Sequence, residues 1–541
     1  MTDDLREAAR QAADAATAHL AAVPGGPVWR PVAGPDLEWL TRQPLPAVGR
    51  PLAELLGDVD RHVLPYPMGN GHPRFFGWVN SPPSAAGVVV APLAAAMNPS
   101  CAGGEHAGVL LERTAVRWLA ELAGFPHRPG GGLLTSGASM ATVVALAAAR
   151  QRAVPDVRET GLSGHPPLAL YLSEEGHSCL RKAAELLGLG SRQIRTVPVD
   201  DAFRMDTAAL RRLVVADREA GVRPFFVAAS AGTVNTGAVD PLADVAEVAR
   251  EHGLWFHVDG AYGALGVLAD ECRPAYAGLE LADSLALDPH KWLGVPVDCG
   301  CVLFRDPSDP RAAFSLVPPY LRDDDAGELG WFSEYGPEQT RPFRALRVWA
   351  TIAHLGGDGV AGLVRHTTRL ARVLAAMIED SGDFDLLAPV VTSVVAFRHR
   401  PAGLDSAAVE TLNEAIPAAV QRRGRAFLTG TRLRGGPARL CAPPGHDRGR
   451  PRRSAGGDPG RLVMPWVGTA GVRTAGVRTA GVRTAGVRRP PSGCGSPAAP
   501  PRPARRAGTG GRRPRSRAAV PWARSGRSPR AGRAPRRAPR A

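Results

Sequence analysis

The chain has 541 residues and a formal net charge of +15, and this positive charge arises from its last fifth. Residues 436–541 contain 25 arginines and two acidic residues, whereas residues 1–435 contain 41 basic and 49 acidic side chains, a net charge of −8. The basic composition therefore does not indicate that the main part of the protein binds a polyanion.

The cysteine pattern and the N-terminal sequence exclude several further classes of protein. Seven cysteines at scattered positions form neither a disulfide framework nor a CxxC metal motif. The acidic start MTDDLREAAR is not typical of a secretory signal, and the longest apolar run, at 85–97, is interrupted by Pro92 and too short to span a bilayer. We therefore expect a cytoplasmic protein without a bound metal and without a membrane partner.

The predicted elements change character along the chain. Residues 1–100 are expected to form mainly helices, and apolar residues at helical spacing predict a further helix at 106–125. From about residue 131, short apolar runs alternate with helical segments; the runs of strand length are 168–173, 225–230, 254–259 and 299–304. This alternation predicts a mostly parallel sheet covered by helices on both faces, whose ligands bind at the carboxyl ends of the strands.

The C-terminal part is predicted to be a smaller unit followed by a tail. A helix is expected at 341–357 and a strand within 390–400, as parts of an α+β unit. After about residue 435 the sequence consists mainly of Arg, Pro, Gly and Ala, and TAGVR occurs four times at 469–488. This composition predicts disorder. A frameshifted end is the interpretation we favour; an inert extension and a nucleic-acid-binding arm are the alternatives.

Lysine is rare in this sequence and therefore informative. Of 66 basic residues, only Lys182 and Lys291 are lysines. Unlike arginine, lysine can lose its proton and act as a nucleophilic amine. Lys182 lies beside Arg181 in a predicted helix, where a solvated face explains it. Lys291 lies in the motif DPHKW, directly after a strand-like segment, and is the candidate nucleophile.

Polar residues follow several other predicted strands or open a helix. Ser139 lies in a small-residue turn that begins a helix, where free backbone amides suit a phosphate. Asp259 ends a strand, where its carboxylate could face a cationic nitrogen. His177 and Thr233 follow two further strands. Taken one at a time, a helix cap, a strand-end turn or a solvated side chain explains each of them at least as well.

Taken together, these stretches resemble the group II pyridoxal-phosphate-dependent decarboxylases, which include aromatic-L-amino-acid, glutamate and diaminobutyrate decarboxylases. The resemblance covers about residues 40–435. The five stretches that carry it, in the family's order and approximate spacing, are HPRFFGWVNSP, TSGASMATVVALAAAR, GHSCLRKAAELLGLG, HVDGAYG and DPHKW. It implies a fold-type I transferase fold, in which a mostly parallel seven-stranded sheet is flanked by helices, and a homodimer.

The resemblance also implies how the chain is divided. A helical N-terminal segment would span 1–100, and a large α/β domain that binds pyridoxal 5′-phosphate would span 101–345. A small α+β C-terminal domain would span 346–435 and looks incomplete, because the family continues with a further strand and helix. The arginine-rich tail would span 436–541.

The resemblance assigns roles to the candidate residues. Lys291 would form a Schiff base with pyridoxal 5′-phosphate, Asp259 would keep the pyridine nitrogen protonated, and His177 would stack on the ring. The other implied cofactor residues are Ala261 beneath the ring, Thr233 near the ring oxygen or the substrate carboxylate, and Ala138, Ser139 and His290 near the phosphate. The implied substrate pocket contains Phe76, Trp78 and Asn80, which leave aromatic and polar amino acid substrates open.

One departure concerns the proton donor. In the family, a tyrosine on a mobile loop protonates the carbanion-like intermediate. Counting back without gaps from RPFR places Phe332 at that position, whereas Tyr335 requires a small shift. We take Tyr335 as the expected donor, in an enzyme that decarboxylates an L-amino acid to an amine. The alternatives are an enzyme that forms an aldehyde by oxidative deamination, and a non-catalytic binding protein with a basic tail.

Overall fold

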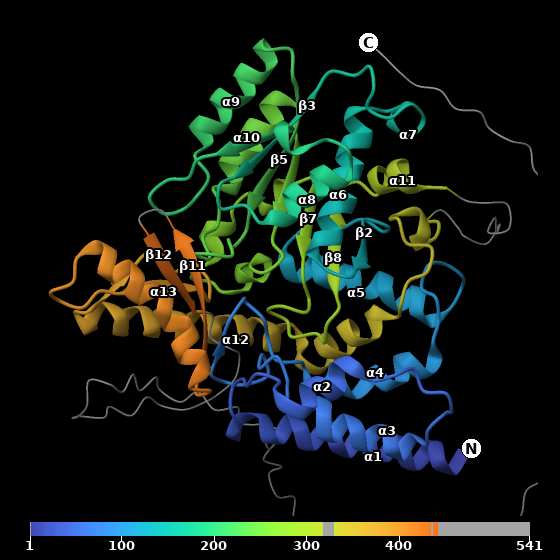
Figure 1. The fold of residues 1–541 in the computed structure, drawn as a ribbon. Coiled ribbons are helices and arrows are strands. Elements are labelled where there is room, and N and C mark those ends of the chain that lie inside the picture. The colour runs from blue at the N-terminus through green and yellow to red at the C-terminus, as the bar shows by residue number, and fades with distance from the viewer. Residues whose placement is uncertain (1, 317–328, 434–435, 442–541) are drawn as a thin grey trace, which may run out of the picture. The chain divides into compact units, whose positions relative to one another are not determined.

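The computed structural model describes residues 2–316, 329–433 and 436–441 (Figure 1). All of them belong to one unit, Met1–Arg473. The TAGVR repeats, the predicted disorder after residue 441 and the frameshift interpretation lie outside the described residues. Within this described part, no helix combines the length and the apolar character needed to cross a bilayer.

The N-terminal segment is helical, as expected. Its helices are α1 (Thr2–Ala22), α2 (Gly34–Arg42), α3 (Leu52–Asp58) and α4 (Ala85–Met97), and a short strand β1 (Phe75–Phe76) lies before α4. The Ser84 hydroxyl caps α4 by accepting a hydrogen bond from the Gly87 amide at 3.1 Å. Helix α5 (Ala107–Ala123) follows and ends at Gly124 in the left-handed conformation. Helices α1, α2, α3 and α4 lie below the large sheet in Figure 1, whereas α5 lies beside β8.

The large sheet has seven strands in the order β2-β8-β7-β6-β5-β3-β4. The strands are β2 (Gly132–Thr135), β3 (Leu168–Ser173), β4 (Ile194–Val197), β5 (Arg223–Ser230), β6 (Trp255–Asp259), β7 (Ser284–Leu287) and β8 (Gly300–Phe304). Only β8 runs against the others, because its pairings with β2 and β7 are antiparallel and the remaining pairings are parallel. The prediction of a mostly parallel seven-stranded sheet is confirmed, and so are the four predicted strands β3, β5, β6 and β8.

Apolar residues on both faces of these strands explain why helices cover the sheet twice. In β3, Leu170 packs in the cluster that contains helix α6, whereas the neighbouring Tyr171 packs in the cluster that contains α5. The helices around the sheet are α6 (Ala138–Ala153), α7 (Val157–Thr160), α8 (Ser178–Leu186), α9 (Thr207–Glu219), α10 (Leu242–His252) and α11 (Ser308–Phe314). Every residue of β2, β3, β6, β7 and β8 is buried.

A second sheet of five strands belongs mainly to the C-terminal region and has the order β1-β11-β12-β10-β9. Its strands and helices are α12 (Arg344–Ser381), β9 (Phe384–Leu386), β10 (Val395–His399), α13 (Ser406–Arg422), β11 (Phe427–Leu433) and β12 (Gly436–Cys441). The expected α+β character is therefore present. We expected regular structure to end at residue 435, but β12 begins at 436; its backbone pairs with both β10 and β11, and these two ladders compensate for its weak strand composition.

Candidate functional site

The predicted cofactor residues meet at the carboxyl edge of the large sheet. Asp259 ends β6, Lys291 follows β7, and His177 and Thr233 follow β3 and β5. Parallel strands bring these positions to one edge. A small cavity there is lined by Glu175, His177, Ser230, Gly232, Thr233, Val234, Asp259, Ala261, Tyr262 and Lys291. Five of the predicted residues, from four separate stretches of sequence, thus line this cavity.

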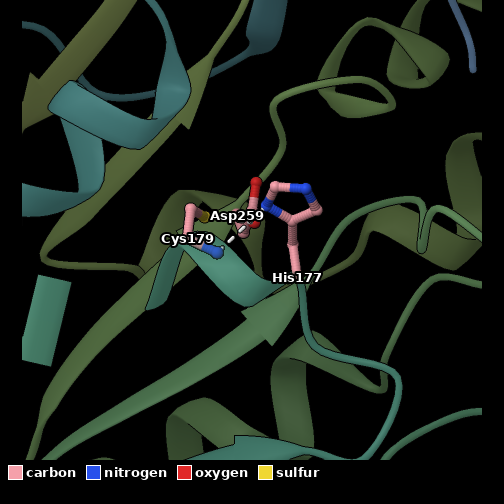
Figure 2. Close-up of side chains that lie close together, drawn as sticks. All are labelled: His177, Cys179 and Asp259. Atoms are coloured by element: carbon pink, nitrogen blue, oxygen red, sulfur yellow. Dashed lines mark hydrogen bonds between the residues drawn. The ribbon is translucent and has the colours of Figure 1, made fainter. Parts of the chain in front are cut away.

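Asp259 is a buried carboxylate that lines the cavity. Its side chain is accessible only slightly, and its Oδ1 accepts a hydrogen bond from the Ala261 amide at 3.1 Å. Figure 2 shows the His177 ring beside this carboxylate, with Cys179 on the other side. The Cys179 amide donates to His177 Nδ1 at 3.3 Å, which orients the imidazole at the start of α8. Within the described residues, no basic side chain forms an ion pair with Asp259.

His177, Cys179 and Asp259 also have the spacing of a metal site, because one ligand atom of each lies within 4.8 Å of the other two. Burial, together with the neighbouring Asp259 carboxylate, raises the pKa of Cys179 to about 12. The Cys179 Sγ lies 3.9 Å from Asp259 Oδ2, so the thiol and the carboxylate are in contact at this cluster.

Lys291 is linked to the start of helix α6 through a buried carboxylate. Its Nζ lies 3.4 Å from Asp288 Oδ2, and Asp288 Oδ1 accepts a hydrogen bond from the Ala138 amide at 2.7 Å. Burial raises the pKa of Asp288, and the charges of Lys291 and His290 oppose that rise. Asp288 was not among the predicted site residues, although it is the first residue of DPHKW. The sequence offered no sign that its side chain turns back toward α6.

The predicted phosphate end is partly occupied by contacts within the chain. The Ala138 amide is already bonded to Asp288, whereas the Ser139 side chain in the first turn of α6 is exposed. His290 Nδ1 lies 2.6 Å from the Cys299 carbonyl oxygen, which fixes its ring. Gly300 lets β8 approach this turn, since a Cβ there would lie 2.4 Å from the Gly137 carbonyl carbon. Ser139 and His290 remain the groups able to meet an anion here.

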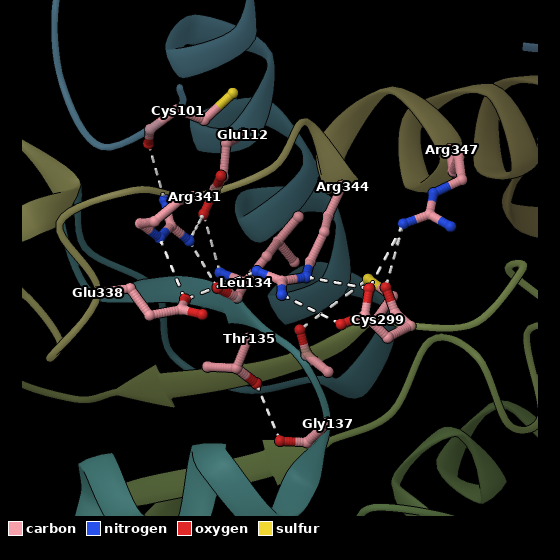
Figure 3. Close-up of polar contacts among 12 residues, drawn as sticks. Cys101, Glu112, Leu134, Thr135, Gly137, Cys299, Glu338, Arg341, Arg344 and Arg347 are labelled. Carbon is pink, nitrogen blue, oxygen red and sulfur yellow. Dashed lines mark hydrogen bonds and ion pairs between the residues drawn. The ribbon is translucent and has the colours of Figure 1, made fainter. Parts of the chain in front are cut away.

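A buried arginine, Arg341, forms hydrogen bonds that stabilise β2 beside this edge of the sheet (Figure 3). Arg341 donates to Glu112 Oε1 and to the Leu134 carbonyl, both at 2.5 Å, and Glu112 Oε1 accepts from the Leu134 amide at 2.9 Å. Both charged side chains are 1% exposed. Nearby, Arg344 forms an ion pair with Asp298 at 3.1 Å, just before the segment that bonds to His290. Arg341, just before α12, therefore fixes β2, and Arg344 at the start of α12 fixes the loop before β8.

The residues predicted to line the substrate pocket lie elsewhere in this chain. Phe76 packs in the core of the second sheet with Val395 and Leu428. Trp78 is about half exposed, and its ring lies 5.0 Å from that of Phe427. None of Phe76, Trp78 and Asn80 lines the cavity beside Lys291. Their role in substrate binding stays a prediction.

Both candidate positions for the proton donor are buried outside the cavity. The Tyr335 hydroxyl donates to the Leu329 carbonyl at 2.6 Å, and burial raises the pKa of this phenol. Phe332 lies under the guanidinium groups of Arg113 and Arg341, at 5.2 and 4.8 Å. Residues 317–328, which precede this segment, lie outside the described residues. The assignment of Tyr335 as donor is untested by this arrangement.

The observed site fits pyridoxal 5′-phosphate, because a lysine amine and a buried carboxylate, for which the described residues provide no ion-pair partner, line the same cavity. A family model described as the pyridoxal-dependent decarboxylase conserved domain matches residues 36–400. The chain belongs to this decarboxylase family. It is accordingly a carboxy-lyase with pyridoxal 5′-phosphate as its cofactor, and the expected fold type is confirmed by solved structures.

Relatives of this decarboxylase include enzymes with different products. It is 32% identical over 442 residues to an aromatic-L-amino-acid decarboxylase of Bacillus atrophaeus, which covers 80% of this chain and 89% of the relative. It is 29% identical over 403 residues to a phenylacetaldehyde synthase of Arabidopsis thaliana, covering 72% and 81% of the two chains. The structure of an Oryza sativa TDC with PLP and tryptamine is similar, with a TM-score of 0.77, 28% identity and coverage of 82% and 94%.

Sequence reasoning missed six residues at the site: Glu175, Ser230, Gly232, Val234 and Tyr262 line the cavity, and Asp288 contacts Lys291. Tyr262 and Asp288 lie inside quoted motifs and Ser230 ends a predicted strand, so their positions were available in the sequence. Glu175 lies two residues before His177 on the same loop. Nothing in the local pattern distinguished it from the exposed Glu174 beside it.

Proposed function

We propose that this protein converts an L-amino acid and a proton into the corresponding amine and carbon dioxide, using Lys291 and Asp259 as its main cofactor residues. The observation that carries the proposal is the placement of both side chains on one cavity at the carboxyl edge of the large sheet. When bound, the cofactor accepts the electron pair left behind by carbon dioxide.

Each residue has a separate task in this proposal. The Lys291 amine would hold the cofactor covalently when no substrate is bound. The buried Asp259 carboxylate keeps a proton on the ring nitrogen, because a cation opposite it removes the cost of an unpaired buried charge. The His177 imidazole forms one wall, and the exposed Ser139 hydroxyl and His290 bind the phosphate.

An aldehyde-forming reaction is the second candidate, and the residue that occupies the proton-donor position decides between the two. The Tyr335 phenol is bonded to the Leu329 carbonyl and is buried away from the cavity, and Phe332 stands at the ungapped donor position. Without a proton donor, the reaction would consume dioxygen and water and release an aldehyde, carbon dioxide, ammonia and hydrogen peroxide. The aldehyde synthase among the relatives supports this alternative.

The proposal is tested by incubating the cofactor-loaded protein with a panel of L-amino acids that includes tryptophan, and measuring carbon dioxide, amine, aldehyde and hydrogen peroxide. Release of carbon dioxide with an equal amount of amine supports decarboxylation, and aldehyde with peroxide supports the second candidate. Absence of carbon dioxide from every amino acid, despite bound cofactor, would contradict both.

The proton donor is tested with two reciprocal variants. If Tyr335 donates the proton, Tyr335→Phe shifts the products from amine toward aldehyde, whereas Phe332→Tyr leaves the ratio unchanged. If the Phe332 position governs the outcome, Phe332→Tyr raises the amine share and Tyr335→Phe has no effect on it. Unchanged amine formation in Tyr335→Phe removes Tyr335 from the role we expect.

We further propose a homodimer, since large apolar side chains are exposed on the N-terminal helices. On one face of α4, Val89, Leu93 and Met97 are 70%, 58% and 56% exposed, at the spacing of successive helical turns. A contiguous exposed apolar face is typical of a protein interface. Leu93→Glu is expected to halve the mass measured by light scattering; an unchanged dimer mass would exclude this face as the interface.

A further inference from the structure

Two buried aromatic rings lie stacked beside Lys291. Trp292, the next residue in the chain, has its ring centroid 4.9 Å from that of Tyr262, with an angle of 15° between the two planes. Both side chains are buried, and Tyr262 lines the cavity together with Lys291. Trp292 and Tyr262, here termed the aromatic pair, therefore connect the turn after β7 to the loop after β6.

The turn after β7 is tight, and Trp292 anchors it in the core. The Lys291 amide donates to the Asp288 carbonyl at 2.9 Å, and the Gly294 amide donates to the Lys291 carbonyl at 3.0 Å. The backbone of Lys291 is thus bonded on both sides within the turn, while the side chain of the following residue, Trp292, is buried in the main core cluster. A displacement of the Trp292 ring would accordingly move the backbone that carries the Lys291 amine.

The C-terminal region contacts each ring of the aromatic pair at its one polar atom. The Trp292 indole N–H donates to the Thr367 hydroxyl on α12 at 2.9 Å. The Tyr262 hydroxyl contacts the Ser393 hydroxyl in the loop before β10, and it accepts a hydrogen bond from the Ser393 amide at 3.2 Å. Burial raises the pKa of Tyr262 to about 12, so this phenol stays neutral at physiological pH.

These hydrogen bonds fix the direction of both rings. A buried N–H or O–H group is costly when it has no partner, so an aromatic side chain with a polar atom is oriented by the group that this atom meets. Loss of a partner would let the ring turn or shift toward another one. Because a nucleophile displaced by about 1 Å can lose about a hundredfold in rate, a small shift of Trp292 would affect Lys291 measurably.

We infer that Thr367 and Ser393 are positioning residues, which hold the aromatic pair and through it the Lys291 amine at the cavity. This inference rests on the proposed role of Lys291 as the attachment point of the cofactor. It gives α12 and the loop before β10 a role in retaining the cofactor, although neither segment contributes a residue that lines the cavity in the described structure.

The test measures the release of pyridoxal 5′-phosphate from the cofactor-loaded protein after dilution, followed by the loss of visible absorbance. Thr367→Val keeps the side-chain volume and removes the partner of the Trp292 N–H. It is expected to raise the release rate about tenfold and to weaken the visible circular dichroism of the bound cofactor. Thr367→Ser keeps the hydroxyl and is expected to restore both values to those of the wild type.

The matched control is Thr368→Val, on the next residue of α12. Thr368 is also buried, and its hydroxyl donates to the Val364 carbonyl at 2.9 Å. This variant is expected to lower the free energy of unfolding much as Thr367→Val does, but to leave the release rate within about twofold of the wild type. Equal release rates in the two valine variants would overturn the inference, because the effect would then be a general loss of stability.

The second ring is tested with Ser393→Ala, which removes the hydroxyl beside Tyr262 and keeps the backbone amide. The release rate is expected to rise about threefold. If the stacked rings act as one unit, the double variant with Thr367→Val shows an increase smaller than the product of the two single increases. An increase equal to that product would mean that the rings are held independently, and would contradict a shared positioning role.

Failure of this inference and failure of the proposed function give different results. The release measurement requires only bound cofactor and no substrate. A wild-type protein that binds cofactor but releases no carbon dioxide from any amino acid would contradict the proposed function, while a tenfold faster release in Thr367→Val would still support the positioning role. An unchanged release rate in Thr367→Val, in a protein that does decarboxylate, would overturn the inference alone.

Discussion

The two sheets of this decarboxylase differ in what they contribute to the site. The seven-stranded sheet has strands buried on both faces and carries Lys291, Asp259 and His177 at its carboxyl edge. The five-stranded sheet is mostly antiparallel, its strand β9 is only half-buried, and its strand β11 contacts the turn after β5 through the Thr431 hydroxyl. The residues proposed to hold the cofactor thus lie at the edge of the first sheet, whereas the second sheet contacts the loops at that edge.

The largest effect is expected from removing Lys291, the proposed cofactor lysine at the edge of the first sheet. Lys291→Ala is expected to abolish the visible absorbance of the bound cofactor and to reduce carbon dioxide release by at least about a thousandfold, because no other amine can take its place. The control is Lys182→Ala, since Lys182 is exposed on helix α8. Equal loss of absorbance in both variants would show that Lys291 is not the attachment point.

The second prediction compares a buried ion pair beside the first sheet with exposed ion pairs on the second sheet. Arg341→Met leaves the Glu112 carboxylate buried without its partner behind β2, and is expected to lower the free energy of unfolding by about 3–5 kcal/mol. On the second sheet, Arg432 pairs with Glu410 and Glu414 and its side chain is 70% exposed, so Arg432→Met is expected to cost less than about 1 kcal/mol. Urea denaturation measures both; similar losses would contradict this difference.

A third prediction concerns the contact between the turn after β5, which contains Gly237, and the loop before β10, which contains Thr392. Gly237 has φ +72°, and a Cβ there would lie 2.1 Å from the Thr392 hydroxyl oxygen. Gly237→Ala is therefore expected to lower the free energy of unfolding by about 3 kcal/mol, through backbone strain and this contact together. At Gly253, φ is +65° and no atom lies near the Cβ position, so Gly253→Ala is expected to cost about 1 kcal/mol. Thermal unfolding of both variants measures the two losses of stability. Equal losses would show that the Gly237 position tolerates a side chain.

The smallest expected effect is a pH dependence inside the first sheet. Burial lowers the pKa of His257 to about 4, so below pH 6.5 the unfolded chain takes up a proton that the folded chain does not. Stability is therefore lost as the pH falls, by about 2 kcal/mol between pH 7 and pH 5. Burial raises the pKa of Asp240 to about 6, which opposes this trend.

His257→Gln isolates the histidine contribution, since Asp240 is present in both proteins. The free energy of unfolding of the wild type minus that of the variant is expected to fall by about 2 kcal/mol as the pH falls from 7 to 5. A difference that stays constant over this range would mean that His257 is already protonated, or equally accessible, in the folded state.

Much of the fold followed from local patterns, and the exceptions have physical causes. Fully buried strands such as Leu168–Ser173 are continuous apolar runs, so they were recognised. Strand β4 is only partly buried and gave no such run, and β12 depends on pairing with two neighbours rather than on its own composition. Phe76 and Trp78 were assigned to a substrate pocket through the motif HPRFFGWVNSP of the family that the chain resembles, and that assignment stays a prediction.

The sequence by itself determined the chemistry of this protein. A scarce lysine, an aspartate at a strand end and a histidine after another strand indicated one site, because parallel strands bring their carboxyl ends to one edge. The order of five motifs, through the family that they resemble, indicated its cofactor. Only the tertiary structure decided how that site is held. Contacts such as Asp288 with Ala138 and Thr431 with Asn235 join residues separated by 150 and 196 positions. Local periodicity carries no information about such distant partners, since they are set by the packing of whole elements against one another.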